Sequence, residues 1–217
     1  MNEPLRAALL ADPPKFHYWG DRWRPGGIDP PLLELLERAI AATRITRGVA
    51  RETGAGLSSA WLLCLGFAQV HSHCIDPAVC GRVSDYLQQY PDERARWQCH
   101  IGPSALTLPQ AATALSTPLA DFCLIDGGHG LDNVFTDFVY LNYMLRRGGL
   151  LVLDDLQLGS CRLLHEWLTQ PNMGYTCVDR TPKLAVLRKE TDLRLMRDFG
   201  SHLPFLQRLS GWLGDPQ

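Results

Sequence analysis

From about residue 46 onward, short apolar runs alternate with stretches of helical periodicity. The apolar runs predict seven strands, at residues 48–53, 70–76, 96–101, 122–126, 150–153, 175–178 and 184–187. Helical patterns lie between them, at residues 57–67, 78–90, 104–116, 131–146 and 160–169. This alternation is typical of an α/β fold in which helices cover both faces of a mainly parallel sheet. A short turn joins only the last two strands, so we expect these two to form an antiparallel hairpin.

The two ends of the chain follow a different pattern. Residues 1–28 are rich in Pro, Gly and aromatic side chains, which predicts an irregular arm, and a helix is expected to start near Asp29. Residues 191–217 carry many apolar side chains, which predicts helical segments that pack on the domain or on a partner subunit. We therefore expect an N-terminal arm and cap helix over 1–44, a central domain over 45–190 and a helical tail after it. If the protein forms oligomers, we expect a homodimer whose subunits contact each other through the tail or the arm.

The composition narrows the class of protein. A chain of 217 residues with 46% hydrophobic and 20% charged residues fits one soluble globular domain. The net charge of -2 gives no broad basic surface, so we expect no nucleic-acid partner. The apolar runs are too short to span a membrane, and the N-terminus lacks the pattern of a signal peptide. The seven cysteines are scattered without a C-x-x-C pair, which predicts reduced thiols in a cytoplasmic protein and no zinc site.

A glycine-rich turn follows the first predicted strand. Gly54 and Gly56 allow a sharp bend there, and the amides of the next helix can bind an anionic group, although a plain strand-to-helix turn would look the same. Ser59 stands where a dinucleotide-binding turn has its third glycine. Glu52 could accept a hydrogen bond from the ammonium of an amino-acid ligand, and Asp76 ends the second strand, where an acidic residue commonly holds ribose hydroxyls. Adenosine joined to an amino acid therefore fits this region better than a dinucleotide.

Three acidic residues follow two further strands. Asp126 ends one strand, and Asp154 and Asp155 end the next; in a parallel sheet these ends reach the same edge. Neighbouring strands lie about 5 Å apart, so the carboxylates would repel one another unless they are protonated or bridged by a cation such as Mg²⁺. Helix capping or loop hydrogen bonds would also explain Asp154 and Asp155. His129 can take a proton from a hydroxyl, contact the ligand, or hydrogen-bond a loop.

Together, these motifs resemble the class I S-adenosylmethionine-dependent methyltransferases over about residues 45–188. The matching segments are Glu-Thr-Gly-Ala-Gly at 52–56, Ile-Asp at 75–76, Ile-Gly-Pro-Ser at 101–104, Ile-Asp-Gly-Gly-His at 125–129, Arg-Gly-Gly at 147–149 and Asp-Asp at 154–155. They are most similar to the branch that methylates hydroxyls of small molecules. The resemblance implies a three-layer Rossmann-like α/β fold with a seven-stranded sheet of order 3-2-1-4-5-7-6 whose last strand is antiparallel.

The resemblance also implies roles for individual residues. S-adenosylmethionine would be the cofactor, with its methionine part near Glu52, Gly54 and Ser59, its ribose at Asp76 and its adenine near Ser104. The implied cofactor-binding residues are Glu52, Thr53, Gly54, Ala55, Gly56, Ser58, Ser59, Asp76, Ser104, Asp126 and His129. Metal-dependent members of the family hold Mg²⁺ at the positions that are Asp126, Asp154 and Asp155 here. Catechol-type relatives place a Lys base where this chain has His129.

The resulting hypothesis is methyl transfer to a hydroxyl of a small molecule, with His129 and Asp126 as the catalytic residues and a divalent metal assisting. Metal-independent transfer to oxygen or nitrogen, with His129 as the base, is the nearest alternative. A non-catalytic cofactor-binding partner subunit is the alternative from another class. The sequence does not identify the acceptor. We expect the enzyme to act in natural-product biosynthesis. Four aromatic residues of the arm would cover it: Phe16, Tyr18, Trp19 and Trp23.

Overall fold

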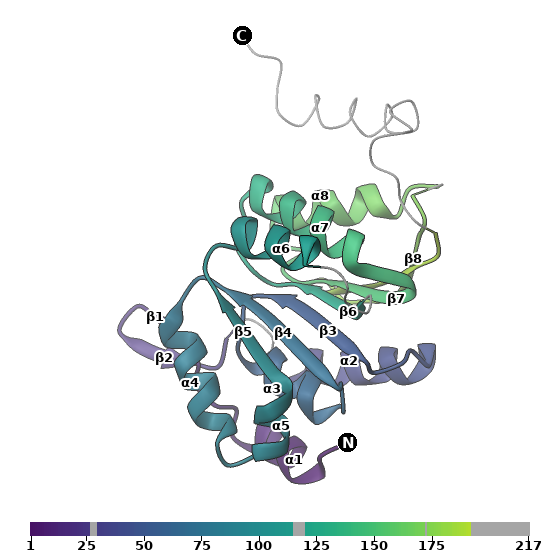
Figure 1. The fold of residues 1–217 in the computed structure, drawn as a ribbon. Helices are drawn as coiled ribbons and strands as arrows, with labels where there is room; N and C mark the ends of the chain where they lie inside the picture. Colours follow the sequence, from purple (N-terminus) through teal and green to yellow (C-terminus); the bar gives the residue numbers. More distant parts are fainter. Residues whose placement is uncertain (27–29, 115–119, 172, 192–217) are drawn as a thin grey trace.

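The central sheet has seven strands in the order β5-β4-β3-β6-β7-β9-β8 (Figure 1). This computed structural model describes residues 1–26, 30–114, 120–171 and 173–191. The strands of the sheet are β3 (Val49–Thr53), β4 (Gln69–Cys74), β5 (Trp97–Ile101), β6 (Ala120–Ile125), β7 (Leu145–Leu153), β8 (Tyr175–Arg180) and β9 (Ala185–Lys189). Strand β9 runs antiparallel to both of its neighbours, whereas the other pairs are parallel. The predicted order 3-2-1-4-5-7-6, with its antiparallel last strand, is confirmed.

Helices cover both faces of this sheet, as the alternating pattern predicted (Figure 1). One face carries α1 (Glu3–Ala11), α2 (Pro30–Thr43), α3 (Leu57–Cys64), α4 (Pro77–Leu87) and α5 (Pro91–Arg96), and the other carries α6 (Ser104–Thr113), α7 (Leu131–Met144) and α8 (Gly159–Leu168). Successive side chains of β6 enter the two cores in turn: Phe122 and Leu124 pack on the first side, Cys123 and Ile125 on the second. Because successive side chains of this buried strand point to opposite faces of the sheet, β6 packs against the helices of both layers.

The N-terminal segment is more regular than its composition predicts. Helix α1 starts after Asn2, whose Oδ1 accepts a hydrogen bond from the Leu5 backbone N–H at 3.0 Å. Leu5 and Leu9, four positions apart, are both fully buried in the core. Strands β1 (His17–Trp19) and β2 (Arg22–Arg24) then form an antiparallel hairpin. The expected irregular arm is therefore wrong here, because a side-chain cap and one apolar pair stabilise a short helix once it packs on a larger core.

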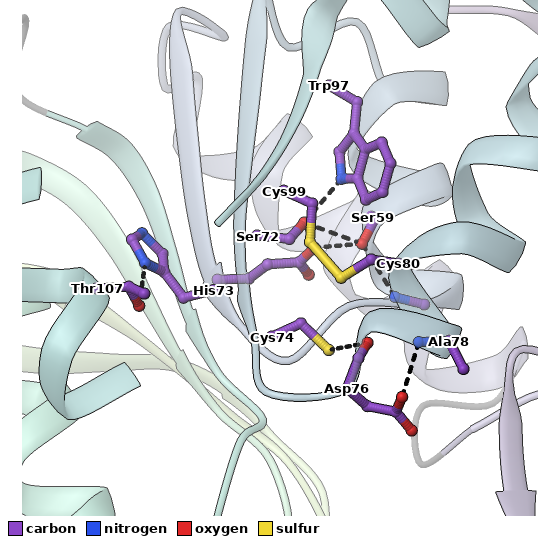
Figure 2. Close-up of a disulfide and its surroundings, with 12 residues drawn as sticks. Ser59, Ser72, His73, Cys74, Asp76, Ala78, Cys80, Trp97, Cys99 and Thr107 are labelled. Carbon is purple, nitrogen blue, oxygen red and sulfur yellow. Dashed lines mark hydrogen bonds between the residues drawn. A yellow bond between two sulfur atoms is a disulfide. The ribbon is translucent and has the colours of Figure 1, made fainter. Parts of the chain in front are cut away.

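Two of the seven cysteines are paired. Cys80 on α4 and Cys99 on β5 form a disulfide, which Figure 2 shows beside the start of α4. The expectation of reduced thiols is wrong for this pair and holds for the other five. The two cysteines are 19 positions apart and meet because β5 pairs with β4, from which α4 leads away. The spacing of these two cysteines in the sequence does not by itself predict the disulfide.

The predicted tail falls almost entirely on residues 192–217, outside the described part of the chain. Its helices, and a dimer formed through it, stay predictions. The boundary at residue 44 also stays a prediction, although α1, α2 and α3 contribute to the same hydrophobic core. Within the described residues, no helix is both long and apolar enough to cross a membrane.

Candidate active site

A cavity of about 410 Å³ opens at the carboxyl ends of the parallel strands. Its wall combines the turn after β3, the end of β4, the start of α6, the loop after β6 and the β1–β2 hairpin. Eight of the expected site residues line it: Thr53, Gly54, Ala55, Asp76, Ser104, Asp126, His129 and Asp155. Five others are not on the cavity wall: Glu52, Gly56, Ser58, Ser59 and Asp154. The edge of the sheet expected from the sequence therefore does hold one continuous site.

The glycine turn forms the floor of the cavity beside β6. Gly54 has φ +90, and a side-chain carbon there would lie 2.6 Å from the backbone oxygen of Asp126. Its N–H donates to the carbonyl of His73 at 2.9 Å. Only a residue without a side chain allows the turn and the loop after β6 to approach so closely in this conformation. Glycine is therefore needed at position 54 because the turn after β3 lies so close to the loop after β6.

Asp76 stands at the junction of β4 and α4, where the sequence placed it. Its Oδ1 accepts a hydrogen bond from the Ala78 N–H at 2.8 Å, as an N-cap residue does (Figure 2). The cap fixes the orientation of a carboxylate that is otherwise exposed and lines the cavity. Ser104, the first residue of α6, contributes another part of the lining. The two residues suit a ribose and an adjoining base.

Glu52 lies beneath the turn and not in the cavity. It is fully buried, and its Oε1 accepts hydrogen bonds from the hydroxyls of Ser59 and Ser72, the latter at 2.6 Å. The indole N–H of Trp97 donates to Ser72 Oγ at 2.8 Å (Figure 2). Burial raises the pKa of Glu52 above its usual value. This network ties β3, α3, β4 and β5 together, and neither Glu52 nor Ser59 lines the cavity.

The three acidic residues meet at the ends of β6 and β7, as predicted. One oxygen each of Asp126 and Asp155 lies within 4.8 Å of the other and of a His129 ring nitrogen. Asp154 is only 1% exposed and is not part of this group. The Nζ of Lys183 lies 3.6 Å from an Asp154 oxygen and 3.9 Å from an Asp155 oxygen. Burial, and then the negative charge of Asp154, raise the pKa of Asp126 well above its usual value.

His129 is held by one of these carboxylates. Its Nε2 lies 2.9 Å from Asp155 Oδ2, and its side chain is 37% exposed on the cavity wall. The hydrogen bond to Asp155 raises the pKa of His129, and the same bond lowers the pKa of Asp155. Asp155 has φ +55, a left-handed conformation that is uncommon for residues other than glycine, although Asp adopts it more often than most. An imidazole oriented by a carboxylate can accept a proton from a bound hydroxyl.

The same group has the chemistry of a divalent-cation site. Asp126 and Asp155 offer carboxylate oxygens and His129 offers a ring nitrogen, donors that divalent ions accept. A cation there would also offset the repulsion that raises the pKa of Asp126. This group differs from the expected set of Asp126, Asp154 and Asp155 in that it contains His129 and not Asp154.

Sequence reasoning missed several residues of the site. His17 comes from the hairpin, where it precedes Tyr18, one of the aromatic residues expected to cover the acceptor. Asn133 comes from α7, and Lys183 comes from the turn between β8 and β9. None of these belongs to a motif. Each of these residues lies at the site because of how its helix, hairpin or turn packs on the rest of the domain. The local sequence does not predict that packing.

Comparison with known proteins gives a family match over residues 52–156, to a family described as a methyltransferase domain. No curated protein sequence matches the chain. Among solved structures, the O-methyltransferase TomG from Streptomyces achromogenes, involved in tomaymycin synthesis and in complex with SAM, superposes with a TM-score of 0.63 and 17% identity, covering 76% of this chain and 82% of TomG. An O-methyltransferase from Bacillus cereus in complex with SAH has a TM-score of 0.61 and 14% identity over 86% of this chain and 88% of its own.

A third similar structure is the MycE methyltransferase of the mycinamycin biosynthetic pathway, in complex with Mg and SAH. It has a TM-score of 0.54 and 18% identity, and the match covers 74% of this chain but only half of MycE. At such low identities, the three structures establish the shared fold and leave the chemistry of the site to its own residues.

Proposed function

Since residues 52–156 belong to the methyltransferase domain family, we propose that this protein transfers the methyl group of S-adenosylmethionine to a hydroxyl of a small molecule. One observation carries the proposal. A single cavity joins the glycine turn and Asp76 to the Asp126–His129–Asp155 group. A volume of about 410 Å³ is within the range of small-ligand sites.

In this proposal, the first half of the cavity binds the cofactor. Asp76 accepts hydrogen bonds from the ribose hydroxyls, and Ser104 lies beside the adenine. The backbone of Gly54 and Ala55, free of bulky side chains, allows the methionine part to approach the start of α3. The bound cofactor supplies a methyl group on a positively charged sulfur.

The second half of the cavity prepares the acceptor. His129 takes the proton of the acceptor hydroxyl at a ring nitrogen while the oxygen attacks the methyl carbon in line with the carbon–sulfur bond. A carbon–oxygen bond forms, the carbon–sulfur bond breaks, and S-adenosylhomocysteine leaves. Asp155 holds the imidazole in place and stabilises the charge that it gains, since the two side chains lie 2.9 Å apart.

We also propose that a divalent cation, Mg²⁺ in the first instance, assists this reaction. Asp126 and Asp155 would hold it, and a ring nitrogen of His129 lies within 4.8 Å of an oxygen of each. Such an ion would supply positive charge that lowers the pKa of the acceptor hydroxyl. MycE, which shares the fold, carries Mg in its structure.

Metal-independent methyl transfer is a second candidate, which Lys183 favours. Its ammonium group lies within 4 Å of oxygens of Asp154 and Asp155 and so gives the acidic cluster a positive charge of its own. In that case His129 alone would prepare the acceptor.

A transfer assay tests the proposal and separates the two candidates. The purified protein is incubated with S-adenosylmethionine labelled in its methyl group and with a pool of natural products that carry hydroxyls, in Mg²⁺ or in EDTA. We expect a labelled methyl ether in Mg²⁺ that is lost in EDTA and lost with His129→Ala. Equal labelling in both buffers selects the metal-independent candidate, and no labelled product from any pool would contradict the proposal. We propose the cytoplasm as the place of action because five of the seven cysteines are free thiols, and we weigh these above the single Cys80–Cys99 disulfide.

A further inference from the structure

The β1–β2 hairpin is held firmly against α4. Arg82 of α4 donates from Nε to the Lys15 carbonyl at 2.9 Å, and its guanidinium lies 4.0 Å from the ring centre of Trp23. Phe16, 1% exposed, meets the ring of Tyr86 edge-on at 5.6 Å. A two-stranded hairpin is not stable by itself, so these contacts determine where it lies. They place it beside the helix that begins directly after Asp76 (Figure 1).

His17 lies directly on the glycine turn. A side-chain carbon at Gly56 would lie 2.7 Å from His17 Nε2, and the imidazole hydrogen-bonds the backbone of Ala55. The negative charge of Asp76 also acts on this ring and partly offsets the lowering of the pKa of His17 by burial. His17 and Tyr18 both line the cavity. The hairpin therefore brings an imidazole to the cavity wall beside the glycine turn.

This position matters because Glu52 does not line the cavity. Glu52 was the side chain expected to accept a hydrogen bond from the ammonium of the cofactor, but it is fully buried and its Oε1 accepts from Ser59 and Ser72 inside the core. Among the described residues that line the cavity, the ring of His73 bonds Thr107 and that of His129 faces Asp155. His17 is the imidazole that lies next to the glycine turn.

The chemistry of His17 suits a neutral acceptor. Burial lowers the pKa of His17, and the hydrogen bond to the Ala55 backbone opposes this shift, as donation to a carbonyl does. A neutral imidazole that donates through one nitrogen can accept through the other. An ammonium group is a donor without an acceptor, so it complements such a ring.

We propose that His17 contacts the amino-acid end of the cofactor, accepting a hydrogen bond from its ammonium, and that the β1–β2 hairpin thereby completes the cofactor site. This inference rests on the proposed function, because it assumes that S-adenosylmethionine binds in this cavity. It assigns to the N-terminal hairpin the role that the motif residue Glu52 was expected to have.

Two ligands that differ only at the amino-acid end test the inference. S-adenosylhomocysteine contains that end, whereas 5′-methylthioadenosine has the same adenine, ribose and thioether without it. Both are titrated calorimetrically into the full-length protein and three variants. His17→Phe keeps a flat ring against Gly56 but has no nitrogen, His17→Gln keeps an acceptor, and Arg22→Ala alters an exposed residue of the same hairpin that does not line the cavity.

We expect His17→Phe to weaken binding of S-adenosylhomocysteine about tenfold or more and to change binding of 5′-methylthioadenosine less than twofold. His17→Gln should recover most of the loss, and Arg22→Ala should match the unaltered protein for both ligands. Equal weakening of both ligands in His17→Phe, or no change in either, overturns the inference while leaving the proposed function in place. If the unaltered protein binds neither ligand, the proposed function itself fails.

Discussion

Nε2 of His129 lies 2.9 Å from Oδ2 of Asp155, although the two residues follow different strands of the sheet. The contact raises the pKa of His129 above its usual 6.5. His129 can act as a base only when it is deprotonated, so methyl transfer should increase as the pH rises through this raised pKa.

Asp155→Asn should remove the charge that raises this pKa. The rising limb of the pH–rate profile should then move to lower pH, and kcat at its plateau should fall about 100-fold or more, because the imidazole loses its orienting carboxylate. The Kd for S-adenosylhomocysteine should stay within about twofold of the original value, and Asp132→Asn, an exposed change outside the cavity, should alter none of these quantities. A pH limb that does not move in Asp155→Asn contradicts this role.

Gly54→Ala should damage the site through its backbone. A side-chain carbon at Gly54 meets the Asp126 carbonyl oxygen, whereas at Gly148, which also has a positive φ of +79, it meets nothing within 4 Å. Gly148→Ala therefore measures the cost of the left-handed conformation alone, about 1–2 kcal/mol. In urea titrations, Gly54→Ala should lose at least about 1 kcal/mol more than this control and should no longer bind S-adenosylhomocysteine. Equal losses in the two variants would show that the close approach to Asp126 is unimportant.

Glu52→Gln tests whether Glu52 belongs to the core rather than to the ligand site. Burial raises the pKa of Glu52 in the folded protein above the unfolded value, so its contribution to stability is present at low pH and is lost as the pH rises through the folded pKa. Gln has no charge to bury. The free energy of unfolding of the variant should therefore exceed that of the unaltered protein at pH 8, by a difference that shrinks towards pH 4.5.

The same variant should bind S-adenosylhomocysteine with a Kd within about twofold of the original, since Glu52 does not line the cavity. A tenfold or greater loss of affinity in Glu52→Gln would mean that this carboxylate does contact the cofactor.

Mg²⁺ should stabilise the protein if the acidic cluster holds it. Adding Mg²⁺ at millimolar concentration should raise Tm, because an ion that binds only the folded state shifts the equilibrium towards it. Asp126→Asn should abolish the rise. Lys183→Met should increase the affinity for Mg²⁺, because it removes a positive charge that lies 3.6 Å from Asp154. A Tm that is insensitive to Mg²⁺ in the unaltered protein and sensitive in Lys183→Met would select the metal-independent candidate.

The fold could be predicted from sequence because its signals are local. Apolar runs such as Phe122–Ile125 and Leu150–Leu153 are short, dense and followed by helical periodicity, and the family match over 52–156 agrees with the motifs found there. Asp76, Asp126 and Asp155 could be located because each follows a strand, and parallel strands bring their ends to one edge. The methyltransferase resemblance is confirmed at this level.

The remaining features depend on packing at a distance. Motif position could not reveal that Glu52 turns towards Ser59 and Ser72, because a strand residue next to a glycine turn can face either side. The approach of Lys183 to Asp154 depends on how the β8–β9 turn packs against the end of β7. The N-terminal hairpin reaches the cavity through Arg82, a residue 67 positions from its partner Lys15.

Calorimetric titration of S-adenosylmethionine into the unaltered protein and into Asp76→Ala tests the central claim most directly, because Asp76 both lines the cavity and caps α4. The account predicts one molecule bound per chain, with an affinity at least tenfold weaker in Asp76→Ala, while Asp85→Ala on the exposed side of the same helix binds as the unaltered protein does. An absence of binding, or equal binding by the unaltered protein and Asp76→Ala, would contradict the claim that this edge of the sheet is a cofactor site.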